Sequence, residues 1–182
     1  MTLPPTAKKV FAGALFDVYQ WEQKLFDGST TTFEMLKRAD SVQIIVSDGK
    51  SMIIAAEEQP VKGSFLSLFG GRVEEGEDPL VAAKRELLEE SGLVSDDWEL
   101  YECVQPYSKI DWRIHTFIAR NCSVAGVQTL DPGEKIMIKY ITFNEFVSLV
   151  TTMRINHPSL AIAFLQARLD GSIDNFQKRF GC

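Results

Sequence analysis

Short apolar runs separated by turn residues fill the first third of the chain, and this pattern favours β-strands. The runs are rich in β-branched and aromatic side chains, which suit a pleated surface. Asp27-Gly28 and Asp48-Gly49 lie between successive runs and are typical of tight hairpin turns. The pattern therefore predicts hairpins built from strands at residues 10–18, 21–26, 30–36, 41–47 and 52–56.

A glycine-rich stretch at residues 63–76 holds a short apolar segment, 65–69, and reads as a strand that leaves into a loop. The periodicity then changes from that of a strand to that of a helix. Asp78 is a suitable N-cap, Pro79 fits the first helical turn, and Gly92 provides a stop. The spacing of Leu80, Ala83, Leu87 and Leu88 predicts a helix over residues 79–91.

Further strands are expected at residues 98–104, 114–119 and 136–141. Thr142 and Glu145 form a capping-box pattern that opens a helix over 143–152, and a last helix over 159–169 should end at Gly171. The order of strands, helix, strands and two helices favours an α/β fold with a mixed sheet covered by helices on both faces.

Composition and charge narrow the classes of function. The 182 residues are 45% hydrophobic and 24% charged, which is typical of a globular chain with one catalytic domain. A net charge of -6 argues against nucleic acid as a partner, because that role needs clustered Lys and Arg. The apolar segment near the N-terminus is too short for a membrane span, so a cytoplasmic protein without a membrane partner is expected. Three widely spaced cysteines fit free thiols: Cys103, Cys122 and Cys182.

The predicted helix at 79–91 carries the chemistry. Glu86, Glu89 and Glu90 are three and four residues apart, so their carboxylates project from one face. Like charges at this spacing repel unless a cation lies among them, although a solvated acidic face has the same appearance. Mg²⁺, or alternatively Mn²⁺, prefers such oxygen ligands.

From Gly71 the chain reads GRVEEGEDPLVAAKRELLEESGL. This segment resembles the Nudix box, Gly-x5-Glu-x7-Arg-Glu-U-x-Glu-Glu-x-Gly-U with U aliphatic, at every fixed position. The matching residues are Gly71, Glu77, Arg85, Glu86, Leu87, Glu89, Glu90, Gly92 and Leu93.

The resemblance implies a Nudix α/β/α sandwich and the hydrolysis of a diphosphate linked to another group. It implies that Glu86 and Glu90 are metal ligands and that Glu89 is a ligand or base, with the carbonyl of Gly70 as a further ligand. It assigns Glu77 to an auxiliary or structural role beside Arg85, whose fork would hold the neighbouring carboxylates in register. Gly71 and Gly92 complete the structural positions of the box.

The general base is less well defined. The resemblance to the ADP-ribose pyrophosphatase branch implies that the base is a glutamate on a loop just before a strand. Glu134 lies at the corresponding point, in the segment LDPGEKIMI. A surface acid beside a turn would look the same. Glu89 is the competing candidate.

Features outside the box point to the branch that cleaves ADP-ribose and other nucleoside-diphosphate sugars, such as GDP-mannose. These are the long N-terminal β-region, the LDPGEKI segment and the position of Pro106. The resemblance implies an N-terminal β-region at 1–40 that dimerises, followed by a Nudix hydrolase domain at 41–182. We therefore expect a homodimer that releases a nucleoside monophosphate and a sugar phosphate.

Candidate substrate contacts lie in the N-terminal region and beside the box. Tyr19, Trp21 and Phe33 could stack on a nucleobase, although core or interface roles suit them too. Arg38 and Arg72 could bind phosphates or be surface cations. Structural roles are expected for His115 and His157, which have no partner at ligand spacing.

Two other functions remain open from the sequence. One keeps the chemistry but changes the substrate to a nucleoside triphosphate or a dinucleoside polyphosphate, which the long N-terminal region disfavours. The other is a Nudix fold that binds a ligand without turnover, which the complete set of box glutamates disfavours.

Overall fold

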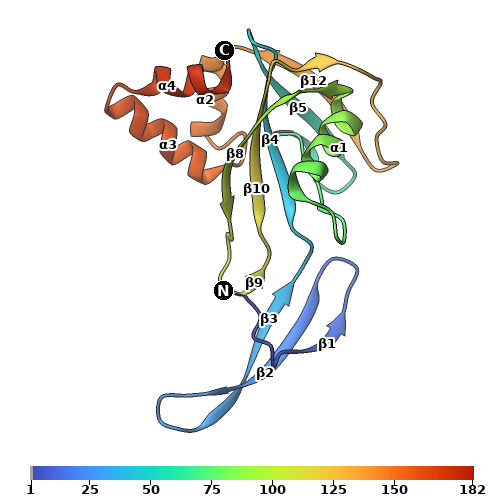
Figure 1. Cartoon of the computed structure of the whole chain (residues 1–182), viewed down its shortest axis with the longest axis vertical. Coiled ribbons are helices and arrows are strands. Elements are labelled where there is room, and N and C mark those ends of the chain that lie inside the picture. The colour runs from blue at the N-terminus through green and yellow to red at the C-terminus, as the bar shows by residue number, and fades with distance from the viewer. Residues whose placement is uncertain (1) are drawn as a thin grey trace.

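The computed structural model describes residues 2–182, which form a six-stranded main sheet, a four-stranded N-terminal sheet and four helices (Figure 1). The main sheet has the order β12-β5-β4-β10-β8, and β6 pairs with β5. β4 and β10 are parallel and the other pairs are antiparallel, so the sheet is mixed. Its strands are β4 Ser41–Ser47, β5 Met52–Gln59, β6 Gly63–Ser67, β8 Asp97–Val104, β10 Ile114–Arg120 and β12 Lys135–Ile141.

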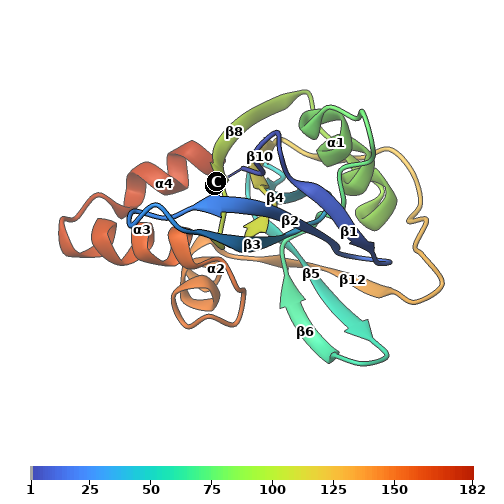
Figure 2. The same cartoon turned by 90° about the horizontal axis from the view of Figure 1, so that it is seen from below.

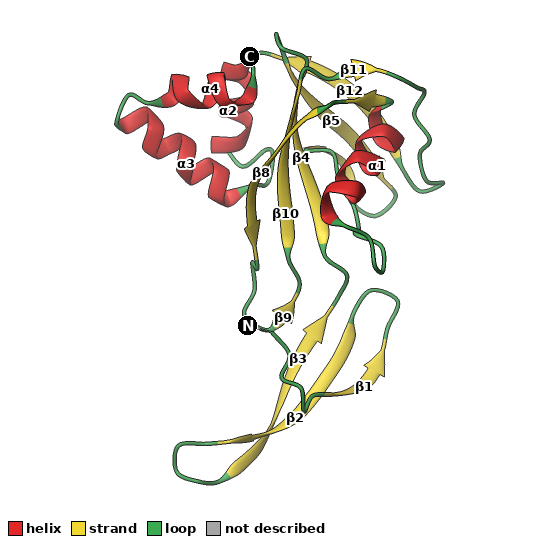
Figure 3. Ribbon diagram, in the orientation of Figure 1, coloured by secondary structure: helices red, strands yellow, loops and turns green. Residues whose placement is uncertain are grey.

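Helices cover both faces of the main sheet, as Figure 3 shows, so the expected α/β/α sandwich with a mixed sheet is confirmed. One helix lies on one face and three lie on the other. They are α1 Pro79–Ser91 on the first face, and α2 Phe143–Thr151, α3 Pro158–Leu169 and α4 Ile173–Phe180 on the second.

Two separate cores follow from the period-two geometry of the strands. On β4, Ile44 packs in the core that contains Leu87 of α1, while the next residue, Ile45, packs in the core that contains Phe146 and Phe164. All five side chains are fully buried. Central strands that are apolar on both faces are typical of a sheet sandwiched between helices.

The N-terminal sheet has the order β1-β2-β3-β9 and lies beyond one end of the main sheet (Figure 1). In the view from below it therefore lies in front of the main sheet (Figure 2). It is antiparallel except for the short parallel pair β3 and β9. Its strands are β1 Lys8–Ala12, β2 Asp17–Lys24, β3 Thr30–Lys37 and β9 Ile110–Asp111. A further small pair joins β7 Leu93–Val94 to β11 Ser123–Val124.

The expected strand at residues 10–18 is wrong, because the chain turns within it. β1 ends at Ala12, and the backbone N–H of Gly13 donates to the carbonyl of Phe16 at 3.0 Å before β2 begins. Both predicted hairpins are present, β2 to β3 across Asp27-Gly28 and β4 to β5 across Asp48-Gly49. Both turn glycines have positive φ, 87° and 89°, which is the reason for their position.

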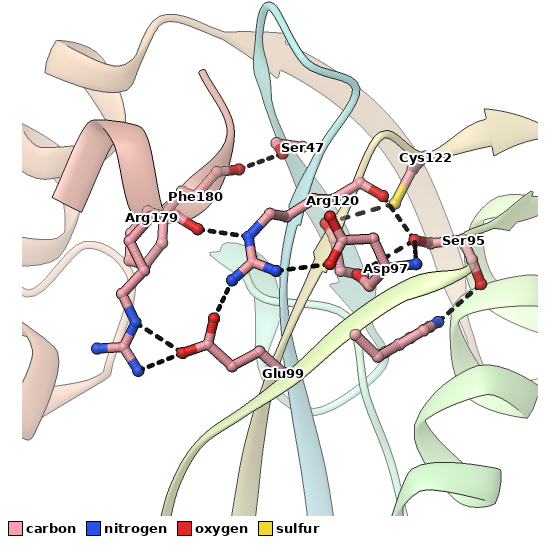
Figure 4. A network of polar contacts seen from close by, with 10 residues as sticks. Ser47, Ser95, Asp97, Glu99, Arg120, Cys122, Arg179 and Phe180 are labelled. Carbon is pink, nitrogen blue, oxygen red and sulfur yellow. Dashed lines mark hydrogen bonds and ion pairs between the residues drawn. The ribbon is translucent and has the colours of Figure 1, made fainter. Parts of the chain in front are cut away.

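The helix α4 was not predicted from the sequence, which suggested only two helices at this end. It is short, and its three apolar residues Ile173, Phe176 and Phe180 all face the second core. Arg179 on α4 donates to Glu99 of β8 at 2.7 and 2.9 Å, and Arg120 of β10 bonds both Glu99 and the carbonyl of Arg179 (Figure 4). These contacts tie α4 to two strands of the main sheet.

Candidate active site

Helix α1 has the ends that the sequence predicted. The side chain of Asp78 accepts the backbone N–H groups of Leu80 at 2.8 Å and Val81 at 3.4 Å, so it satisfies donors that a helix start leaves free. Gly92 ends the helix with φ of 69°, and an added Cβ would lie 2.4 Å from the carbonyl oxygen of Gly126. Asp78 and Gly92 therefore define the ends of α1 and place the three glutamates in its last two turns.

Arg85 connects the acidic residues of this segment. Its Nε and Nη2 donate to the two oxygens of Glu77, each at 3.0 Å, in a bidentate pair. Its Nη1 donates to Glu86 at 2.9 Å and to Glu89 at 3.1 Å, while Nη2 also reaches the carbonyl of Arg72 at 3.0 Å. Bidentate, charge-assisted pairs hold side chains firmly, so the guanidinium fixes the positions of three carboxylates.

Glu90 is a buried carboxylate, only 8% exposed, and no cation pairs with it in residues 2–182. Burial raises the pKa of Glu90 to about 8, and repulsion from Glu86, Glu57 and Glu134 acts in the same direction. The backbone N–H of Gly70 donates to its Oε2 at 2.8 Å and partly opposes the shift. A group kept in this unfavourable setting is characteristic of a functional site.

Glu86 lies beside Glu90, one helical turn earlier. Its pKa is raised mainly by burial, and the guanidinium of Arg85 opposes this shift. Its carboxylate occupies the space next to Gly71, where an added Cβ would lie 2.4 Å from Oε1. A larger residue at position 71 would displace the Glu86 carboxylate, which passes directly over the backbone.

Gly70 has a different requirement. Its φ of 142° is unfavourable for other residues, and an added Cβ would lie 2.1 Å from the carbonyl oxygen of Val42. Backbone bonds from Val42 to Gly71 and from Ile44 to Phe69, each 2.9 Å, hold this segment against β4. The segment thereby brings Gly70 next to Glu90.

Two acids outside helix α1, Glu134 and Glu57, lie close enough to raise the pKa of Glu90. Glu134 precedes β12, and burial raises its pKa, with added repulsion from Asp131 and Glu57. The charge of Glu134 in turn raises the pKa of both Glu86 and Glu90. The sequence missed Glu57, which lies on β5 and bonds Ser67 and Gln59, because its proximity depends on strand pairing.

Within residues 2–182, no group of three His, Cys, Asp or Glu side chains is arranged to enclose a metal ion. Arg85 holds the carboxylate of Glu89 toward itself, and the Glu89 side chain is 43% exposed. Of the three box glutamates, Glu90 is buried against the glycine segment and Glu86 is partly buried against it.

A cleft of about 1090 Å³ opens beside the glycine segment. Gly70 and Gly71 line it, and these are the residues that contact Glu90 and Glu86. Glu134 also lines it. The cleft extends to residues 156–159, at the start of α3. Its wall includes Arg38, Arg72, Pro106, Tyr107, Trp112 and Glu102. The structure therefore brings both arginines, Gly70, Gly71 and Glu134 to one space.

Neither Arg38 nor Arg72 pairs with a carboxylate in the described part of the chain. The Nε of Arg38 is buried and has no hydrogen-bond partner among residues 2–182. Burial and the neighbouring charge of Arg72 lower the pKa of Arg38. Two uncompensated guanidinium groups at one cleft provide a place for an anion.

None of the three N-terminal aromatic residues lines this cleft. Tyr19 lines a second cavity of about 700 Å³, which it shares with Arg38 and Arg72. Trp21 is only 8% exposed and packs against Phe33 with ring centroids 5.9 Å apart. A stacking role for Trp21 and Phe33 stays a prediction, because the single chain does not bring them to the arginines.

The two histidines have structural contacts. The Nδ1 of His157 accepts the backbone N–H of Leu160 at 3.3 Å and caps α3, and burial lowers its pKa. The Nε2 of His115 lies 3.5 Å from the Oδ2 of Asp40. The expected free thiols are also found, since Cys103, Cys122 and Cys182 form no disulfide. No helix in residues 2–182 has the length and apolar character of a membrane span.

Comparison with known proteins adds independent information. The model of the NUDIX domain matches residues 37–164. The chain is 24% identical over 168 residues to an ADP-ribose pyrophosphatase of Bacillus subtilis (strain 168), covering 89% of this chain and 90% of the relative. It is 26% identical over 166 residues to a methanol dehydrogenase activator of Bacillus methanolicus, covering 87% and 89%. A crystal structure of an ADP compounds hydrolase has the same fold, with a TM-score of 0.72, 18% identity, and coverage of 92% and 93%.

Proposed function

Because the chain belongs to the NUDIX domain family and is a Nudix hydrolase, we propose that it cleaves the diphosphate of a nucleoside-diphosphate sugar such as ADP-ribose. The products would be a nucleoside monophosphate and a sugar phosphate. The observation that carries this proposal is one cleft lined by Glu134, by two unpaired arginines and by the Gly70–Gly71 segment, which contacts Glu90 and Glu86. The names of two similar proteins, an ADP-ribose pyrophosphatase and an ADP compounds hydrolase, support the substrate class.

The acidic residues fit a divalent cation. Glu86 and Glu90 are hard oxygen donors that repel each other, and burial makes their charged forms costly until a cation lies between them. Together with Glu89 and the carbonyl of Gly70, they would hold Mg²⁺ or Mn²⁺. When bound, such a cation would neutralise the diphosphate and make the attacking water more acidic.

The chain's own residues then divide the remaining work. Arg38 and Arg72 orient the diphosphate through charge-assisted hydrogen bonds, and Arg85 keeps Glu86 in place from the side. Glu134 accepts the proton of the attacking water, since its raised pKa makes it a better base than an ordinary glutamate. Glu89 is the competing base.

The substrate proposal is tested by a panel of ADP-ribose, GDP-mannose, a diadenosine polyphosphate and dGTP with Mg²⁺. A phosphatase in the assay reveals monoester products. We expect the two nucleoside-diphosphate sugars to be cleaved at least about tenfold more efficiently than the others. Preference for dGTP or the dinucleotide would replace the proposal by a triphosphate or polyphosphate pyrophosphatase, and no turnover with any of them would favour a ligand-binding module.

The role of Glu134 is tested by Glu134→Gln. This change keeps the size of the side chain but removes the proton acceptor, so kcat should fall about 10²- to 10⁴-fold while KM changes little. Glu58→Gln is the matched control, because Glu58 is an exposed glutamate that pairs with Lys135, next to Glu134, and its loss should leave kcat within about twofold. A fall of less than about fivefold for Glu134→Gln would transfer the role to Glu89.

We also propose that the N-terminal β-region, residues 1–40, dimerises the chain, with residues 41–182 as the hydrolase domain. Val10 and Phe11 on β1 and Leu15 in the following turn are 53%, 59% and 46% exposed, an apolar surface that a second copy would bury. Light scattering should show a dimer at micromolar concentration, and Phe11→Glu should shift it to monomer. A monomeric parent chain would overturn the dimer but leave the substrate proposal standing.

A further inference from the structure

Two aromatic rings form a shelf along the cleft, on the connection that pairs with β3. Tyr107 and Trp112 lie in the connection between β8 and β10, with ring centroids 6.4 Å apart and an angle of 18° between the rings. Both line the cleft of about 1090 Å³. Tyr107 is 58% exposed, so much of its ring remains open to contact. We call this pair the aromatic shelf.

The shelf is held in place by polar contacts. Trp112 Nε1 donates to Ser41 Oγ at 3.1 Å, at the start of β4. The side chain of Gln105 donates to the carbonyl of Ile110 at 2.8 Å, and the N–H of Ile110 reaches the carbonyl of Tyr107 at 3.4 Å. A ring that is fixed before a ligand arrives loses little entropy on binding.

Arg38 joins the shelf to the anion-binding part of the cleft. The Cζ of its guanidinium lies 4.4 Å from the centre of the Trp112 ring, a cation–π distance. Its buried Nε has no hydrogen-bond partner in residues 2–182, and Arg72 lies close enough to lower its pKa. An aromatic surface beside unpaired guanidinium groups matches a planar base attached to a diphosphate.

We propose that the aromatic shelf binds the nucleobase of the substrate, with the diphosphate on Arg38 and Arg72. This inference rests on the proposed nucleotide substrate and specifies its placement: the base stacks within the same chain, on Tyr107 and Trp112. A purine is favoured because its larger π-surface covers more of the shelf. The shelf is a base-binding surface separate from Tyr19, which lines the second cavity with the same two arginines.

A purely structural role would give different results. Trp112 contacts Ser41 and Arg38, which connect the N-terminal sheet to the main sheet, so the shelf contributes to that connection. If that were its only role, replacing the exposed ring of Tyr107 would change stability but not discriminate ligands with a base from ligands without one. Binding measurements separate the two roles.

The test measures binding of AMP and of ribose 5-phosphate to the full-length protein by calorimetry, without metal or turnover. For Tyr107→Leu we expect an AMP Kd about tenfold higher, which is the usual size of a lost stacking contact, and an unchanged Kd for ribose 5-phosphate. Tyr107→Phe keeps the ring and should bind AMP within about twofold of the parent. Tyr140→Leu, at a tyrosine that is 54% exposed and outside the cleft, is the matched control.

Fluorescence gives a second readout from Trp112. AMP should quench the tryptophan emission of the parent chain, and Trp112→Phe should remove most of that quenching while Trp21 and Trp98 still emit. Equal AMP affinity for Tyr107→Leu and the parent would overturn the shelf, as would a parent chain that does not bind AMP at millimolar concentration.

The failure of the shelf and of the proposed function are distinguishable. Cleavage of ADP-ribose with the same kcat/KM in Tyr107→Leu would overturn the shelf and leave the function intact. AMP binding that depends on Tyr107, in a chain that cleaves no nucleoside-diphosphate sugar, would support the shelf and remove the proposed substrate.

Discussion

Glu90→Gln should lower kcat for the proposed nucleoside-diphosphate-sugar substrate at least about a thousandfold. The amide has nearly the same volume but no negative charge, so it removes the charge of the proposed metal ligand and leaves the core unchanged. Glu90 is the most buried acid of the box and contacts the glycine segment directly. Steady-state kinetics at saturating Mg²⁺ measures the effect, and circular dichroism checks the fold.

Glu75→Gln is the control for Glu90→Gln, because it removes the same charge from the exposed loop before α1. It should retain turnover within about twofold. A kcat for Glu90→Gln within tenfold of the parent would contradict the assignment of Glu90 as a ligand.

The pH dependence of stability provides a second check on Glu90 without turnover. Its pKa in the folded chain is about 8, above the value of about 4.3 in an unfolded chain. Between these values the folded state binds more protons than the unfolded state, so the free energy of unfolding falls as pH rises from about 4 to 8 without metal. Glu90→Gln should flatten this fall, and Mg²⁺ should raise the Tm of the parent most at pH 8.

Phe180→Ala should lower the free energy of unfolding by about 3–5 kcal/mol, which is the usual cost of removing a fully buried phenylalanine. Its side chain is 0% exposed and lies 5.9–6.5 Å, centroid to centroid, from five other rings. The neighbouring rings are Tyr101, Phe143, Phe146, Phe164 and Phe176. Urea unfolding measures the loss.

Phe26→Ala is the matched control, because that side chain is fully exposed in the β2–β3 turn. It should change stability by no more than about 0.5 kcal/mol. The fraction of Phe180→Ala protein that stays folded should keep the parent kcat, because Phe180 packs in the core on the opposite face of the sheet from α1. Equal stabilities of the two variants would show that α4 is dispensable.

The sequence was most informative where local geometry decides the structure. Asp78, Pro79 and Gly92 define α1 without help from distant residues, and the glutamate spacing follows from the helix itself. The Asp-Gly turns likewise place both hairpins, because their glycines need positive φ. The contacts of Arg85 with Glu77, Glu86 and Glu89 follow from the same short stretch.

Features that depend on contacts between residues distant in the sequence could not be predicted. Glu57 meets the box acids only because β5 pairs with β6 and lies beside β4. Tyr107 and Trp112 form a shelf because the connection between β8 and β10 folds back beside Ser41. α4 has too few residues for a clear periodicity, and its stability comes from packing and from the Glu99 contacts.

The register of β4 determines both which core each of its side chains enters and where the Gly70 backbone lies. Ile44 and Ile45 face opposite cores, while Val42 and Ile44 hold the Phe69–Gly71 backbone through hydrogen bonds of 2.9 Å. A slip of one residue would exchange the two cores and offset Gly70 from Glu90 at the same time. Deleting one codon within β4 should therefore abolish folding and activity together, whereas lengthening the Asp48–Ser51 turn should be tolerated by both.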